Sequence, residues 1–150
     1  MVVCKPPLRY RISNLDRKIF LAGSIEMGKA NNWQTKVEEH FKDRNGIVLF
    51  NPRRDDWDSS WEQSINNAQF YTQVRWELDH LESSDDIIMH FEPNTMSPIS
   101  LLELGLYADS GKLLVSCPDG FWRKGNVEIV CEQYGIMCYN SIEELLLNNF

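Results

Sequence analysis

The sequence Pro98-Ile-Ser-Leu-Leu-Glu-Leu-Gly-Leu-Tyr-Ala108 predicts a helix that is apolar on almost every side. Such a helix belongs in the interior of a protein, where a carboxylate is costly to ionise. Glu103 is the only charged residue between Glu92 and Asp109, so it needs a partner, a raised pKa or a chemical task. A structural explanation is also open, because Ser100 and Glu103 have the spacing of a capping box at a helix N-terminus. This stretch fits a cap and a catalyst equally well.

Short apolar runs alternate with helical patterns on both sides of this helix. The predicted strands cover residues 18–22, 47–50, 86–91 and 113–117, with a brief strand near Met137. The other predicted helices cover 32–43, 70–83, 126–134 and the residues from Ser141 onward. This alternation predicts an α/β fold, a single flavodoxin-like (Rossmann-like) doubly wound parallel sheet of about five strands with helices on both faces. We divide the chain into an irregular N-terminal arm, residues 1–16, and one domain, residues 17–150.

Composition narrows the classes of function. The formal net charge of −7, with no basic block to offset it, argues against binding to a nucleic-acid polymer. The N-terminal residues do not resemble a signal peptide, and no apolar run has the length of a membrane span. The four cysteines lack the spacing of a metal site and the density of a disulfide scaffold. We therefore expect reduced thiols in a cytoplasmic protein that does not bind membranes.

The predicted fold indicates where a ligand would bind. In open parallel sheets, ligands bind beyond the carboxyl ends of the strands. Residues 23–32, 51–67, 92–97 and 118–126 are expected at this rim, and they are rich in Trp, Arg, Asp and Asn. Such side chains suit a polar small molecule with an aromatic part. Glu103 is expected one or two turns into the helix that leaves the third strand, close to the same rim.

A second acid is expected beside Glu103. In the helix over 70–83, Phe70, Val74, Leu78 and Leu81 form an apolar stripe, and Glu77 falls at its edge. This position predicts a partly buried carboxylate next to the sheet. A solvated surface acid is the open alternative.

Several blocks of the sequence, in the same order, resemble the nucleoside 2-deoxyribosyltransferase superfamily. The resemblance is closest to its small nucleoside 2-deoxyribosyltransferase-like branch, which is related to 2′-deoxynucleoside 5′-phosphate N-hydrolases, and it covers residues 18–134. The blocks are Ile19-Phe-Leu-Ala-Gly-Ser-Ile25, Asn51-Pro-Arg-Arg-Asp-Asp-Trp57, Trp76-Glu77 eight residues before Asp85, and Ser97-Pro-Ile-Ser-Leu-Leu-Glu-Leu-Gly105.

The resemblance implies an enzyme that cleaves or exchanges the N-glycosidic bond of nucleosides or nucleotides, without a metal or organic cofactor. It implies that Glu103 is the nucleophile and that Glu77 helps to protonate or hold the leaving base. An Asn at the position of Asn126 is lent to the sugar site by a neighbouring subunit in relatives, which implies a homodimer or larger homo-oligomer. The substrate-binding residues that we expect are Phe20, Gly23, Ser24, Asn51, Arg53, Asp55, Asp56, Trp57, Ser97 and Asn126.

Two departures from the family pattern keep alternatives open. Phe20 stands where relatives carry a Tyr, so that hydroxyl is absent and a catalytically silent nucleotide-binding or signalling module is one alternative. The other alternative is a nucleoside 5′-monophosphate hydrolase, because Ser97 matches a Ser that contacts phosphate in such relatives. Glu26, however, replaces their phosphate-binding Arg and would repel a phosphate. Lys29, Arg53 or Arg54 could compensate for this charge, and Trp57 or Trp61 could stack on the base or only close the rim.

Overall fold

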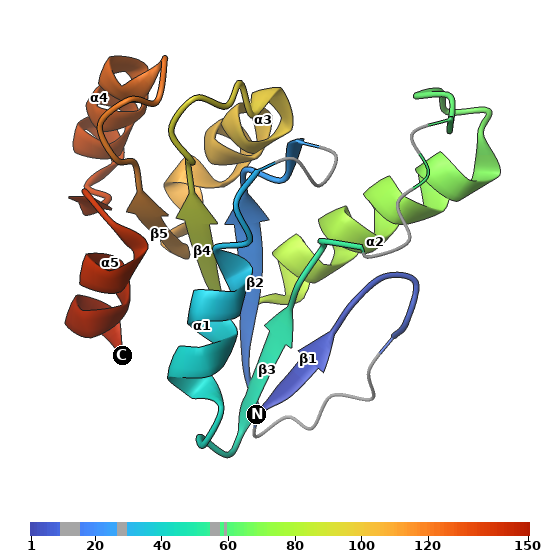
Figure 1. Cartoon of the computed structure of the whole chain (residues 1–150), viewed down its shortest axis with the longest axis horizontal. Coiled ribbons are helices and arrows are strands. Elements are labelled where there is room, and N and C mark those ends of the chain that lie inside the picture. Colours follow the sequence, from blue (N-terminus) through green and yellow to red (C-terminus); the bar gives the residue numbers. More distant parts are fainter. Residues whose placement is uncertain (10–15, 27–29, 55–57, 59) are drawn as a thin grey trace.

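The computed structural model of the protein describes residues 1–9, 16–26, 30–54, 58 and 60–150. In this part of the chain, six strands form one parallel sheet in the order β1-β3-β2-β4-β5-β6 (Figure 1). The strands are β1 (Val2–Cys4), β2 (Arg17–Gly23), β3 (Ile47–Phe50), β4 (Asp86–His90), β5 (Leu113–Ser116) and β6 (Cys138–Tyr139). The helices are α1 (Gln34–Phe41), α2 (Ala68–Ser83), α3 (Pro98–Tyr107), the short 3₁₀ helix η2 (Ala108–Ser110), α4 (Lys124–Tyr134) and α5 (Ile142–Asn149).

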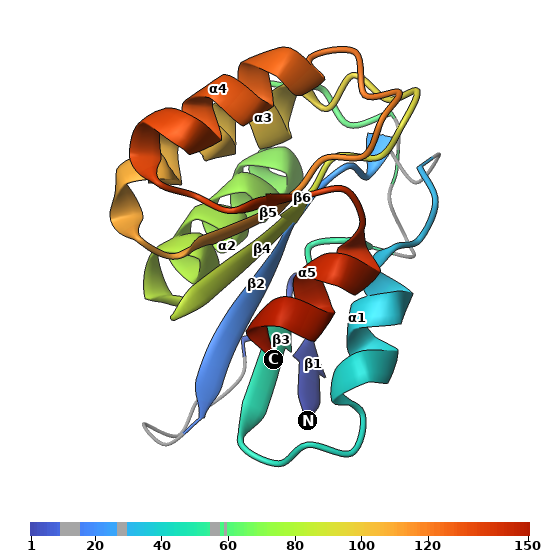
Figure 2. The same ribbon diagram turned by 90° about the vertical axis from the view of Figure 1, so that its left-hand side faces the viewer.

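Helices cover both faces of the sheet, which confirms the predicted doubly wound fold. The helices α2, α3 and α4 lie on one face, whereas α1 and α5 lie on the other (Figure 2). Because successive side chains of a strand point to opposite faces, Phe20 packs on the α2–α4 side and Leu21 on the α1–α5 side. Each face therefore has its own apolar core, and the strands between them are buried almost completely.

The sheet has one strand more than expected, and the expectation of an irregular arm is wrong for residues 2–4. β1 pairs in parallel with β3, so that Val2 lies opposite Val48 and Cys4 lies opposite Phe50. A strand of three residues is too short to show a periodicity in the sequence. The unpaired edge of β3 supplies the hydrogen bonds that order it.

The face of α2 that is buried also differs from the prediction. Of the predicted stripe, Leu81 is buried as expected, but Phe70, Val74 and Leu78 are only partly buried. Trp76 and His80 pack into the core instead. The indole of Trp76 stacks on the ring of His80, with centroids 4.0 Å apart, and lies 6.2 Å from the ring of Phe20. A buried tryptophan removes more apolar surface from water than a valine or leucine does, so the contact of Trp76 with Phe20 on the sheet decides the rotation of α2.

The carboxyl ends of β2 and β4 come together at the point where the chain reverses its direction across the sheet. The crossover from β2 leads to β3 on one side, and the crossover from β3 leads to β4 on the other. Gly23 has a φ of +133°, and a Cβ at this position would lie 2.1 Å from the carbonyl oxygen of His90. Only glycine permits this approach. The loops after β2 and β4 therefore leave the sheet side by side, at the usual ligand position of an open parallel sheet.

Two further predictions from composition can be compared with the structure. The four cysteines are free thiols, and Cys117 and Cys131 are buried in the core as expected. Burial is the main cause that raises the pKa of the Cys117 thiol to about 12. Within the described residues, no helix combines the length and apolarity that a membrane span requires.

Candidate active site

Glu103 lies in the middle of α3 with only 8% of its surface exposed. The helix begins at Pro98 after the N-cap residue Ser97, so Ser100 is already inside it and the capping-box alternative does not apply. Among the described residues, the Glu103 carboxyl group makes no hydrogen bond or ion pair. Burial, followed by the negative charge of Glu77, raises the pKa of Glu103 to about 8.

Glu77 is the second acid of this site, and it is partly buried as predicted. Its Oε1 accepts a hydrogen bond of 2.7 Å from Nε2 of Gln73, one helical turn earlier on α2. Burial raises the pKa of Glu77, and the hydrogen bond from Gln73 opposes this shift. Because the charge of Glu77 raises the pKa of Glu103, the ionisation of the two acids is coupled.

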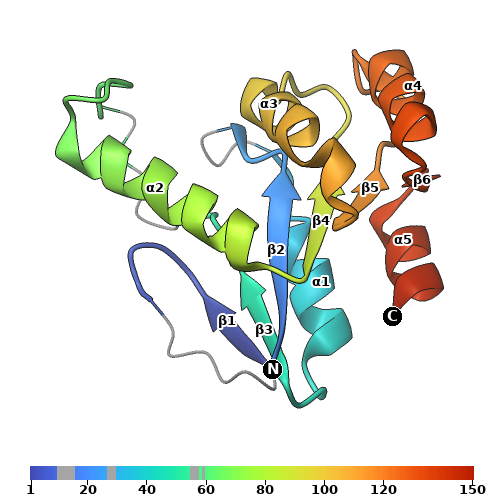
Figure 3. The same cartoon turned by 180° about the vertical axis from the view of Figure 1, so that it is seen from behind.

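The two acids are placed by their neighbours in the sequence. Trp76 and Leu104 are both buried in the core on the α2–α4 side of the sheet. Figure 3 shows α3 over the ends of β2 and β4, and α2 on the same face with its C-terminal end beside β2. Phe20 is fully buried in the same core, beneath Trp76. It therefore supports the helices from below, and its ring occupies a position in the core rather than at the surface of the site.

Three hydroxyl groups gather where the loops after β2 and β4 meet. The Oγ of Ser24 lies 2.6 Å from the Oγ of Ser97 and 3.0 Å from the Oγ1 of Thr95, and those two oxygens are 2.9 Å apart. The backbone N–H of Glu92 donates to the Oγ of Ser24 over 2.8 Å. This cluster joins the loop after β4 to the end of β2 and fixes the position where α3 begins.

The carboxylate of Glu26 occupies the N-terminus of α3. Its Oε1 accepts hydrogen bonds from the backbone N–H groups of Met96, at 3.0 Å, and Ser97, at 2.7 Å. The first amides of a helix carry partial positive charge and attract anions. Both Glu26 and Ser97 have a positive φ, of 49° and 45°, which is unfavourable for residues other than glycine. In this strained conformation, the carboxylate of Glu26 occupies the position at the start of α3 where the anion of a ligand would otherwise bind.

A buried histidine network supports the same loop. The Nδ1 of His90 lies 2.8 Å from the Oγ of Ser116, and its Nε2 lies 2.9 Å from Oε2 of Glu92. The arrangement has the residue types of a serine hydrolase triad, but Ser116 is fully buried and no substrate reaches it. Burial lowers the pKa of His90, so the ring is neutral and serves to hold Glu92 in place.

Asn51 and Arg53, two of the expected substrate residues, are engaged inside the chain. The Nδ2 of Asn51 donates to Oε1 of Glu38 over 2.7 Å, and its Oδ1 accepts from the backbone N–H of Arg53. The guanidinium group of Arg53 donates to the backbone oxygens of Ala30 and Asn31. These contacts tie the loop after β3 to the loop after β2.

The remaining expected residues are placed as follows. Asn126 is exposed on α4, and its side chain makes no hydrogen bond to any residue that the structure describes. Asp55, Asp56 and Trp57, together with Lys29, lie outside the described residues. In the same described part of the chain, no group of His, Cys, Asp and Glu residues is arranged to hold a metal ion.

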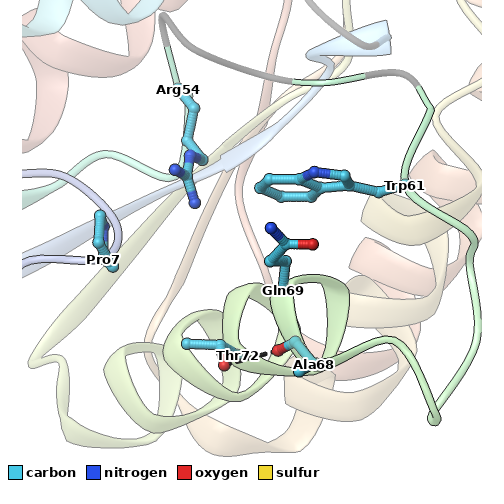
Figure 4. A pocket seen from close by; sticks show the side chains of 6 residues that line it. All are labelled: Pro7, Arg54, Trp61, Ala68, Gln69 and Thr72. Atoms are coloured by element: carbon cyan, nitrogen blue, oxygen red, sulfur yellow. Dashed lines mark hydrogen bonds between the residues drawn. The ribbon is translucent and has the colours of Figure 1, made fainter.

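A cavity of about 440 Å³ opens beside the first half of α2 (Figure 4). Its described lining residues are Pro7, Arg54, Trp61, Ala68, Gln69 and Thr72. The Cζ atom of Arg54 lies 5.1 Å from the ring centroid of Trp61, and its Nη1 lies 3.5 Å from Oε1 of Gln73. Because Gln73 also donates to Glu77, a chain of polar contacts connects this cavity with the acid pair.

Two of these features were not predicted from the sequence. One is Gln73, although its position four residues before Glu77 on a helix was a sufficient signal. Glu26 was recognised only as a departure from the family pattern. Its contact with α3 spans 71 residues of sequence, and no local pattern predicts such a contact.

A family described as nucleoside 2-deoxyribosyltransferase like matches residues 16–121 of the chain. The matched segment contains β2, both acids and the hydroxyl cluster. The chain belongs to the nucleoside 2-deoxyribosyltransferase-like family. This result confirms the resemblance inferred from the sequence and supports action on a small nucleoside substrate. A search of curated proteins gives no match. The family match ends before Asn126, so it does not extend to the residue expected to act across subunits.

Proposed function

We propose that the protein cleaves or exchanges the N-glycosidic bond of nucleosides or deoxynucleosides through a covalent glycosyl-Glu103 intermediate. The observation that carries this proposal is the pair of carboxyl groups of Glu103 and Glu77, whose pKa values are both raised by burial. Retaining glycosyl transfer usually uses two carboxyl groups whose surroundings give them different pKa values. One acid supplies the nucleophile and the other supplies the proton.

The first step transfers the sugar to the enzyme. The Glu103 carboxylate attacks C1′, and the C1′–N bond breaks with its electron pair leaving on the base. Glu77 gives its proton to a nitrogen of the departing base. In the second step, water or another base attacks C1′ and breaks the ester to Glu103, while Glu77 takes a proton from the attacking group. A water molecule gives hydrolysis, and a second base gives exchange.

This mechanism requires a particular distribution of protons over the two acids. Burial raises the pKa of both carboxyl groups, that of Glu103 to about 8, whereas the reaction needs an ionised Glu103 and a protonated Glu77. Positive charge develops at C1′ in the oxocarbenium-like transition state. That charge stabilises the ionised form of Glu103 and lowers its pKa. The proton is then more stable on Glu77, next to the base that receives it.

We further propose that the substrate carries a free 5′-hydroxyl group rather than a 5′-phosphate. Glu26 places a carboxylate on the amides of Met96 and Ser97, which would otherwise attract a phosphate. Two unit charges 4 Å apart repel by about 4 kcal/mol at an effective dielectric constant near 20. A hydroxyl group, by contrast, can donate a hydrogen bond to this carboxylate.

We also propose that the protein acts as a homodimer or larger homo-oligomer. Ile99, Leu102 and Leu106 form an apolar strip on the outer side of α3, and each is 59% exposed. On α2, the partly buried Phe70, Val74 and Leu78 line an apolar groove of about 240 Å³. These surfaces belong to the helices that carry Glu103 and Glu77. A second copy of the chain that covers them would therefore also shield the acid pair from solvent.

The decisive experiment compares turnover by the wild-type protein and by Glu103→Gln. A panel of nucleosides and their 5′-monophosphates, with and without an acceptor base, is analysed by chromatography for released base. We expect Glu103→Gln to lose several powers of ten in kcat while remaining folded. Mass spectrometry of the wild-type protein with a slow substrate should find a sugar on the peptide that contains Glu103.

Glu82→Gln is the matched control, because Glu82 is an exposed acid on α2. It should keep normal turnover. A Glu103→Gln protein with near-normal activity would overturn the proposed nucleophile. A wild-type protein that binds nucleosides without any turnover would instead support the silent binding module.

A further inference from the structure

Gln73 is a buried polar side chain that joins α2 to the loop after β3. Only 3% of its surface is exposed, and its amide group has three polar neighbours. The Nε2 atom donates to Oε1 of Glu77 over 2.7 Å and lies 3.4 Å from the backbone oxygen of Pro52. The amide oxygen lies 3.5 Å from Nη1 of Arg54. Buried polar groups need such partners, so these contacts hold the amide in place.

The same neighbours decide which way the amide faces. The backbone oxygen of Pro52 can only accept a hydrogen bond, and the guanidinium group of Arg54 can only donate one. In the reversed orientation, the amide oxygen would face the oxygen of Pro52 and the NH₂ group would face the guanidinium group. Both contacts would then be repulsive. The NH₂ group of Gln73 is therefore the end that is turned toward Glu77.

This contact makes the two carboxyl oxygens of Glu77 unequal. Oε1 accepts the N–H of Gln73, whereas Oε2 makes no hydrogen bond to any residue that the structure describes. In a protonated carboxyl group, the oxygen without the proton is the better acceptor. A protonated Glu77 therefore carries its proton on Oε2, and this oxygen is the one that can donate to another molecule.

We propose that Gln73 is a positioning residue, which keeps Oε1 of Glu77 as a hydrogen-bond acceptor and assigns the transferable proton to Oε2. The inference rests on the proposed function, in which Glu77 protonates the departing base. As the C1′–N bond breaks with its electron pair on the base, the proton moves from Oε2 to a nitrogen of the base, and Glu77 becomes a carboxylate. The hydrogen bond from Gln73 is then charge-assisted and stronger, so it helps Glu77 to release the proton.

The first measurement follows the ionisation of Glu77 without turnover. A ¹³C NMR titration of Glu103→Gln protein, labelled at the side-chain carboxyl carbons of glutamate, removes the coupling between the two acids. The signal of Glu77 is the one that Glu77→Gln abolishes. Gln73→Met removes the donor at similar length and should raise the pKa of Glu77, because the hydrogen bond favours the carboxylate. Gln73→Glu keeps the length but cannot donate when ionised, and it should shift this pKa in the same direction.

The second measurement compares two kinds of substrate in the background of the native Glu103. On ordinary nucleosides, Gln73→Met should lower kcat by about 10-fold or more, because Glu77 becomes a weaker acid. On a glycoside whose leaving group needs no proton, the loss should be less than about threefold. KM should change little for either substrate. Gln133→Met is the matched control, since Gln133 is exposed on α4, and it should keep both rates.

Two results would overturn the inference. One is a pKa of Glu77 that stays unchanged in both Gln73 variants, and the other is an equal loss of kcat on the two kinds of substrate. Gln73 would then only join α2 to the loop after β3. A wild-type protein without turnover would instead contradict the proposed function, and the NMR titration alone would decide whether Gln73 controls the proton of Glu77.

Discussion

Glu103 has an environment that a purely structural acid would avoid. Its carboxyl group is buried without a hydrogen-bond partner among the described residues, and a second acid lies close to it. Both features favour the protonated form, so the folded protein holds a proton at a pH where the unfolded chain has released it. The residue is therefore expected to lower the stability of the fold at neutral and alkaline pH.

The stability of the Glu103→Gln protein relative to wild type should increase as the pH rises. The pKa of Glu103 is near 4.5 in the unfolded chain and about 8 in the folded protein. Between these values the unfolded state loses the proton first, so wild-type stability falls with increasing pH, and the fall is complete above about pH 8. Glutamine does not titrate. In urea unfolding, the variant should gain roughly 4 kcal/mol over wild type at pH 8 relative to pH 4. An offset that does not change with pH would contradict the raised pKa.

The catalytic pH profile should show the shared proton. If the reactive form holds one proton on the acid pair, kcat/KM should decline above about pH 8, where that proton is lost. Glu77→Gln removes the negative charge that raises the pKa of Glu103 and also removes the proton donor. We expect kcat to drop by about 10²–10⁴ on ordinary nucleosides and much less on a substrate whose leaving group needs no proton. A kcat/KM that keeps rising through pH 8 in the wild type would contradict a role for the shared proton.

At the scale of secondary-structure elements, the start of α3 is the most informative feature. Ser97 is its N-cap residue, but its side chain makes no capping hydrogen bond. The carboxylate of Glu26 accepts hydrogen bonds from the backbone N–H groups of Met96 and Ser97. The loops after β2 and β4 are therefore joined by a charged contact as well as by the hydroxyl cluster of Ser24, Thr95 and Ser97. The same contact decides which charge this end of the site accepts.

Glu26→Gln should change the preference at the 5′ end of the substrate. The glutamine oxygen can still accept from Met96 and Ser97, so the loop is expected to keep its conformation while the negative charge is lost. The ratio of kcat/KM for a 5′-monophosphate to that for the nucleoside should rise by at least about 10-fold. Wild-type protein should favour the nucleoside. A strong wild-type preference for monophosphates would show that a basic side chain controls this end of the site.

At the scale of the whole molecule, the two helices of the site have apolar outer surfaces that are exposed among the described residues. Ile99, Leu102 and Leu106 on α3 are more than half exposed, and the groove along α2 is also apolar. Extended apolar patches on a protein surface usually mark an interface. Asn126 lies exposed on α4 of the same layer, where a neighbouring copy could receive it.

Assembly is tested with matched leucine substitutions. Light scattering of the wild-type protein at micromolar concentration should give a dimer or a larger species. Leu102→Glu, on α3, should shift it toward the monomer, because the charge would be buried without a partner. Leu147→Glu introduces the same change at an 83% exposed leucine on α5, on the other face of the sheet, and should leave the assembly intact. A fully active monomer would remove Asn126 from any role across subunits.

The sequence by itself determined the alternation of strands and helices and the position of the acid inside an apolar helix. These features depend on local patterns, since the buried strands are apolar over consecutive residues and Glu103 is surrounded in the sequence by apolar residues. The family resemblance was carried by short blocks such as Ser97–Gly105, which are also local. For this reason the fold class, the family and the burial of Glu103 were all predicted correctly.

Tertiary structure decided the features that depend on contacts between distant residues. β1 forms because β3 offers it an edge, and α2 turns its Trp76 side inward because the rings of Phe20 and Phe50 on the sheet pack against it. Glu26 binds the amides of Met96 and Ser97 across 70 and 71 residues of sequence, and Gly23 permits the close approach of β2 to β4 beside this contact. The free energy of each contact comes from two segments that fold together, so neither segment shows it alone.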